Sequence, residues 1–68
     1  MITVRVGKMP GRIQEVEVEE GATIAEVVEQ TGLDVSGFES RINGTTVAMD
    51  TVVEEDQDIL FFRKIKGN

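Results

Sequence analysis

The clearest structural signal in the sequence is the stretch 23–33, which reads TIAEVVEQTGL. Thr23 and Glu26 have the spacing of a capping box, in which the threonine hydroxyl accepts from the Glu26 amide and the glutamate side chain reaches back to the Thr23 amide. Apolar residues then recur at helical spacing, so that one stripe can pack on a sheet. Gly32 is suited to end the helix in a left-handed conformation. A helix of roughly two turns is not stable alone, and we therefore expect neighbouring strands to hold it.

Segments with a period of two, which is typical of β-strands, flank this helix on both sides. The first two are joined by a turn at 7–11, where Pro10 cannot extend a paired ladder. Asn43-Gly44 joins the third and fourth, because both residues tolerate the positive φ of a tight hairpin turn. The expected strands are residues 2–6, 12–19, 38–42, 45–47 and 59–65.

The last expected strand is strongly apolar, and such a strand belongs in the middle of a sheet. The first strand is its natural parallel partner, with the helix as a right-handed connection across one face. This order of elements predicts an α+β fold, the β-grasp, with a mixed sheet of four or five strands packed on one helix. We expect one domain over residues 1–65 and a short tail at 66–68. The expected core between helix and sheet includes Val4, Val16, Val28, Ile42 and Phe61.

Composition excludes several classes of function. The 68 residues include no Cys and no His, which excludes zinc fingers, iron–sulfur sites, thiol redox chemistry and His- or Cys-based nucleophile relays. The 7 basic and 13 acidic residues give a net charge of −6, which argues against binding to nucleic acid or to an anionic membrane surface. The sequence shows neither a signal-peptide pattern nor an apolar run long enough to span a bilayer. We therefore expect a protein of the reducing cytoplasm.

No group of side chains has the pattern of a catalytic or metal site. The acidic turn 54–58 lacks the spacing and central glycine of a calcium-binding loop, and a solvated turn explains it. The carboxylates of Glu15 and Glu17 fit an exposed strand face. Thr23 and Ser40 have no histidine to activate them. We therefore expect no enzymatic activity, no catalytic residue, no metal site and no cofactor.

The last strand also predicts a surface for protein binding. If Phe61 faces the helix, alternation puts Leu60 and Phe62 on the open face of the sheet. The neighbouring strands then place Arg5 and Arg41 beside them. An apolar pair rimmed by cations on an otherwise acidic surface is typical of a protein docking patch. The alternative is that these residues are scattered exposed apolar side chains of the ordinary kind.

Four motifs along nearly the whole chain resemble the small ThiS and MoaD sulfur carriers, which share the ubiquitin fold. These motifs are EGATI at 20–24, ING at 42–44, DQDILFF at 56–62 and IKGN at 65–68. In that family the chain ends in Gly-Gly, and a partner adenylating enzyme of the ubiquitin-activating type activates the terminal carboxylate. The activated group then becomes a thiocarboxylate or is transferred to an amine. Here Gly67 matches the penultimate glycine, whereas Asn68 replaces the last one.

This replacement leaves two functional hypotheses open. In the first, the protein is a docking module that kept the carrier fold without carrier chemistry of its own, because an activated Asn68 carboxyl group lies within reach of its own side-chain amide. In the alternative, it is a sulfur carrier or protein modifier activated at its C-terminus by an adenylating enzyme, either directly or after removal of Asn68. Both hypotheses require a protein partner.

Overall fold

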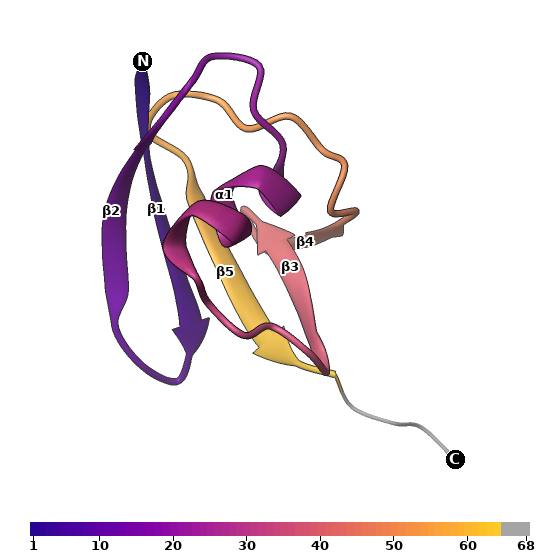
Figure 1. Cartoon of the computed structure of the whole chain (residues 1–68). Coiled ribbons are helices and arrows are strands. Elements are labelled where there is room, and N and C mark those ends of the chain that lie inside the picture. The colour runs from indigo at the N-terminus through magenta and orange to yellow at the C-terminus, as the bar shows by residue number, and fades with distance from the viewer. Residues whose placement is uncertain (65–68) are drawn as a thin grey trace.

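The computed structural model describes residues 1–64, which form a five-stranded mixed sheet with one helix on one face (Figure 1). The elements are β1 (Ile2–Met9), β2 (Ile13–Val18), α1 (Ile24–Thr31), β3 (Phe38–Ile42), β4 (Thr45–Val47) and β5 (Asp58–Arg63). The order across the sheet is β2-β1-β5-β3-β4. The central strands β1 and β5 are parallel, and every other pairing is antiparallel. This is the predicted β-grasp.

Both ends of α1 have the capping interactions that the sequence predicted. The Glu26 amide donates to the Thr23 hydroxyl at 3.3 Å, and the Thr23 amide donates to the Glu26 carboxylate at 3.0 Å. At the other end, Gly32 has φ 75° and donates its amide to the Val28 carbonyl at 2.9 Å. The capping box and the left-handed C-terminal glycine are therefore both confirmed.

The first strand is longer than the sequence predicted. The period of two fades after residue 6, yet β1 continues to Met9 because β5 pairs with it along its whole second half. Gly7 lies opposite Leu60 and Met9 lies opposite Phe62, so tertiary pairing supplies the hydrogen-bonding partners that local sequence does not reveal. The expected turn at 7–11 is thus shorter. The last strand begins one residue earlier than expected, at Asp58, and its expected end at residue 65 lies outside the described residues.

The core lies between the helix and the sheet. Val4, Ile42 and Phe61 are buried, as predicted. Val16 and Val28 pack against this core but are only half-buried. Val16 lies on the edge strand β2, which has a neighbour on one side only, and Val28 belongs to the last turn of a short helix. Five further side chains of the core are fully buried, namely Val6, Ile24, Val27, Val53 and Ile59.

The connection between β4 and β5 ties the start of the helix to the sheet. The amides of Ile24 and Ala25 donate to the carbonyls of Thr51 and Met49, at 3.0 and 2.9 Å. The Val53 amide donates to the Ala22 carbonyl at 2.9 Å. The first two bonds satisfy backbone donors at the helix N-terminus, which have no partner within the helix. They also hold the long connection against the body of the molecule.

Candidate docking surface

Leu60 and Phe62 lie on the face of the sheet opposite the helix, as the alternation predicted. Their neighbours Ile59 and Phe61 are completely buried, whereas both Leu60 and Phe62 are half-buried. The pattern along β5 therefore separates a core side from an open side residue by residue.

The strand register adds two apolar residues to this open side. Ile13 pairs with Gly7, which pairs with Leu60 on its other side. Met9 pairs with Phe62 in the next row of the same face. Ile13 is 48% exposed. We call Met9, Ile13, Leu60 and Phe62 the open-face patch.

Ile13 and Met9 were not predicted from the sequence as members of this patch. Ile13 shares the parity of Glu15, which was assigned to the outer face, so the signal was present in the pattern. Met9 carried no such signal, because the segment around it was expected to be a turn. Only the pairing with β5 places Met9 in a strand.

Gly7 brings the two parts of the patch together. A Cβ atom at this position would lie 2.5 Å from the backbone oxygen of Arg12 and 3.0 Å from the Ile13 side chain. The start of β2 therefore crosses close to β1, and Ile13 occupies the space above the glycine. A side chain at residue 7 would separate Ile13 from Leu60.

Arg41 is fixed at one side of the open-face patch. Its guanidinium carbon lies 4.9 Å from the centre of the Phe62 ring, within the range of a cation–π contact. Its Nε and Nη2 atoms both donate to one carboxylate oxygen of Glu39, at 2.9 and 2.7 Å. Thr46 donates its hydroxyl to the same oxygen at 3.3 Å. These donors, with Arg41 first, hold the pKa of Glu39 below its ordinary value.

Arg5 lies on the same face, but its donors bind the acidic turn. It is hydrogen-bonded to Asp58, its register partner, and its Nη1 atom lies 2.7 Å from an Asp56 carboxylate oxygen. Its Nη2 atom also donates to the Asp56 backbone oxygen at 3.0 Å. The bonds to Asp56 and Asp58 raise the pKa of the Arg5 guanidinium. Arg5 thus fastens the turn before β5 to β1, and its charge is matched by two carboxylates.

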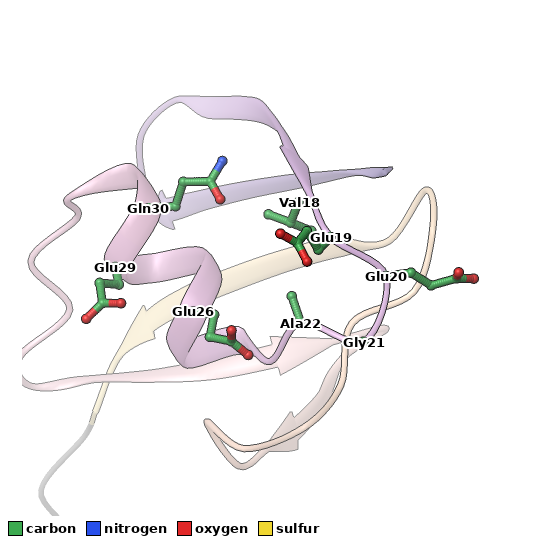
Figure 2. A pocket seen from close by; sticks show the side chains of 8 residues that line it. All are labelled: Val18, Glu19, Glu20, Gly21, Ala22, Glu26, Glu29 and Gln30. Atoms are coloured by element: carbon green, nitrogen blue, oxygen red, sulfur yellow. The ribbon is translucent and has the colours of Figure 1, made fainter.

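A hollow lies between α1 and the segment that follows β2, and acidic residues line it (Figure 2). The side chains of Glu20 and Glu29 point away from the hollow in Figure 2. The Glu26 carboxylate is engaged in the capping box, and Gln30 donates to the Glu17 carbonyl at 2.7 Å. These carboxylates do not converge, and within residues 1–64 no group of acidic side chains is placed to hold a metal ion.

The two hydroxyl groups considered as nucleophiles are used structurally. Thr23 caps the helix, and Ser40 donates to the Val47 carbonyl at 2.8 Å. Over residues 1–64, no helix is both long and apolar enough to cross a membrane. Gly67 and Asn68, the tail residues singled out from the sequence, lie outside the described residues.

Comparison with known proteins supports the fold. No family model and no curated protein sequence matches the chain. Among solved structures, SAMP1 from Haloferax volcanii is similar over 97% of this chain and 99% of its own, with a TM-score of 0.73 and 12% identity. The ubiquitin-like domain of an Arabidopsis thaliana protein is similar over 96% of this chain and 79% of its own, with a TM-score of 0.69 and 20% identity.

A third similar structure is ATBAG1, solved in complex with HSP70. It is similar over 93% of this chain and 40% of its own, with a TM-score of 0.67 and 14% identity. At such identities the likeness shows the fold alone. The chain has the ubiquitin-like β-grasp fold.

Proposed function

We propose that the protein is a ubiquitin-like docking module that binds a partner protein through the open-face patch. The observation that carries this proposal is the grouping of Leu60 and Phe62 with Met9 and Ile13 on the side of the sheet that the helix leaves open. Apolar side chains gathered on one face, with a polar rim, are typical of protein interfaces. ATBAG1, which has a similar fold, was solved as a complex with another protein, and this supports a role in protein binding.

The surroundings of the patch also suit an interface. Arg41 is held over Phe62 by Glu39, so little side-chain freedom is lost when a partner covers it. Arginine and aromatic residues are enriched where binding energy concentrates. Arg5 forms the opposite rim, with its charge already matched by Asp56 and Asp58. We therefore assign the central contacts to Leu60, Phe62 and Arg41, and a peripheral position to Arg5.

The test compares two double variants. Leu60→Ser with Phe62→Ser removes apolar area from the patch, whereas Met49→Ser with Val52→Ser removes exposed apolar side chains from the connection between β4 and β5. Proteins captured by the immobilised wild type and identified by mass spectrometry should be lost with the first variant and retained with the second. Equal capture by both variants would contradict the proposal.

A second candidate function is that of a carrier activated at its C-terminus by an adenylating enzyme. The resemblance to the ThiS and MoaD carriers supports it, and so does the position of the tail directly after the central strand β5. In this proposal the open-face patch holds the enzyme while residues 65–68 enter its active site. Pyrophosphate release, which accompanies adenylation, tests the proposal when the wild type is compared with Asn68→Gly.

A further inference from the structure

The cations of the chain are divided between two places. The three ion pairs found among residues 1–64 all use Arg5 or Arg41, which lie on the open face. The other cations of this part of the chain take part in none of them. They are Lys8, Arg12, Arg63 and Lys64.

These four cations lie together at one end of the sheet, which we call the hairpin end. Lys8 is near the end of β1, Arg12 precedes β2, Arg63 ends β5 and Lys64 follows it (Figure 1, lower end). At the opposite end are the segment after β2 and the turn before β5, which carry Glu19, Glu20, Glu54, Glu55 and Asp56. In a protein with a net charge of −6, the hairpin end thus carries four cations against two nearby acidic residues, Asp34 and Glu39.

Phe38 brings two of these cations together. The Lys8 ammonium lies 4.7 Å from the centre of its ring, and the Arg63 guanidinium carbon lies 6.0 Å from it. Phe38 is the first residue of β3 and pairs with Arg63. Cation–π attraction to one aromatic ring offsets part of the repulsion between the two like charges.

A groove opens beside this cluster, between the β1–β2 hairpin and Leu33, which follows the helix. Lys8 and Arg12 line the groove, together with Val6, Ile13, Gln14 and Leu33. Its wall is therefore partly apolar, with two cations. Asp34 follows Leu33 in the chain, and its carboxylate accepts from the Ser36 amide at 3.1 Å. The hydrogen bonds from Ser36 lower the pKa of this carboxyl group, and the Lys8 charge is a smaller cause.

We propose that this groove binds a short acidic segment of a partner protein, in which carboxylates flank an apolar side chain. The carboxylates pair with Lys8 and Arg12, and the apolar side chain packs against Leu33. Charge complementarity favours an acidic segment, because Lys8 and Arg12 take part in none of the ion pairs among residues 1–64 and a partner carboxylate can pair with them. This surface lies on the helix side of the hairpin and is additional to the open-face patch. Ile13, a member of that patch, lies at the border of the two surfaces.

The chemistry favours a protein segment over a polyanion. A nucleic acid or an anionic membrane presents many negative charges over a wide area. The protein as a whole carries more acidic than basic residues and would repel such a partner outside the groove. A short segment contacts the groove and avoids the carboxylates at the opposite end. The apolar wall of the groove makes no hydrogen bond or ion pair with a phosphate, but it can pack against a leucine-like side chain.

The probe for the test is a short synthetic peptide in which glutamates alternate with leucines. Added to isotope-labelled protein at low salt, it should shift the amide signals of Lys8, Arg12 and Leu33 in NMR spectra and leave those of Leu60 and Phe62 in place. Added salt should reduce binding, because surface charges are screened. The same peptide with lysines in place of glutamates should not bind.

Two variants with the same change in net charge separate the groove from overall charge. Lys8→Gln with Arg12→Gln should weaken peptide binding roughly five- to tenfold, because the two exposed ion pairs with the peptide are lost. Ala25→Glu with Thr45→Glu, at exposed positions elsewhere, should change it much less. Arg12→Gln alone keeps the Lys8–Phe38 contact and guards against loss of folding.

Several outcomes would overturn the proposal. Equal weakening by both double variants would show that only net charge matters. Peptide shifts confined to Leu60 and Phe62 would assign the peptide to the open-face patch instead. Tighter binding at the groove by single-stranded DNA or by phosphatidylserine vesicles would replace the protein segment with a polyanion, and no peptide binding at low salt would leave the groove without the proposed ligand.

Discussion

Arg41 covers Phe62: its guanidinium carbon lies 4.9 Å from the ring centre, while two of its nitrogens bind one oxygen of Glu39. The three residues form one unit on the open face, in which the carboxylate fixes the arginine and the arginine shields the ring. This unit explains how a large aromatic side chain on the side away from the helix is half-buried without a partner chain. It also makes the charge state of Glu39 a reporter of the patch.

The first prediction concerns the titration of Glu39. Hydrogen bonding from Arg41 lowers the pKa of the Glu39 carboxyl group from its ordinary 4.5. Because the folded-state pKa is depressed, the associated stabilisation is present above pH 4.5 and is lost as the pH falls through the folded-state pKa. Arg41→Gln should return the pKa of Glu39 toward its ordinary value, as measured by NMR of the side-chain carboxyl carbon.

Asp34 provides the control for this titration. The pKa of its carboxyl group is also lowered, chiefly by hydrogen bonds from Ser36. Arg41→Gln should therefore leave the pKa of Asp34 unchanged. A Glu39 pKa that stays equally low in the variant would show that Arg41 is not its cause.

The second prediction separates the two sides of β5. Phe61 is completely buried, whereas its neighbour Phe62 is half-buried on the open face. Phe61→Ala should lower the free energy of unfolding by about 3–5 kcal/mol, a large part of the stability of so small a domain. Phe62→Ala removes the same atoms and should cost clearly less. Urea unfolding measures the free energy of unfolding of both variants. If Phe62→Ala were the less stable of the two, the assignment of faces would be contradicted.

The third prediction concerns the close approach of β1 and β2 at Gly7. Gly7→Ala introduces a Cβ atom 2.5 Å from the Arg12 backbone oxygen, and a backbone atom cannot rotate away as a side chain can. We expect a loss of roughly 1–3 kcal/mol in the free energy of unfolding, typical of overpacking. Thr3→Ala, on the same face of β1, is the control and should cost less. A Gly7→Ala protein as stable as wild type would show that the hairpin can shift without penalty.

The sequence alone predicted the elements whose cause is local. The capping box at Thr23 and Glu26, the turn at Asn43 and Gly44, and the alternation that buries Phe61 are all encoded within a few residues. The parallel pairing of the last strand with the first could also be predicted, because the hydrophobicity of the last strand and the handedness of the connection leave few alternatives.

Features that depend on contacts between distant segments were missed or placed differently. The end of β1 depends on its pairing with β5, more than forty residues later in the chain. Arg5 was expected beside Leu60 and Phe62, and the face is right, but the bonds to Asp56 and Asp58 require the folded turn. The cationic hairpin end likewise combines residues of β1 and β5 with residues that flank β2 and β5, which are far apart in the sequence.

The last prediction separates a docking module from an activated carrier, and it concerns Asn68. We expect wild-type protein not to give a stable thiocarboxylate or conjugate with an adenylating enzyme of the sulfur-carrier type, because the Asn68 amide can attack its own activated carboxyl group and the side chain obstructs a channel shaped for glycine. Asn68→Gly removes both obstacles and should gain adenylate-dependent pyrophosphate release that ends in a stable product. Asn68→Ala distinguishes the two causes, since alanine keeps a side chain but cannot cyclise. Stable product from the unprocessed wild type would overturn the docking-module hypothesis, and no turnover by any of the three proteins would exclude recognition by that enzyme.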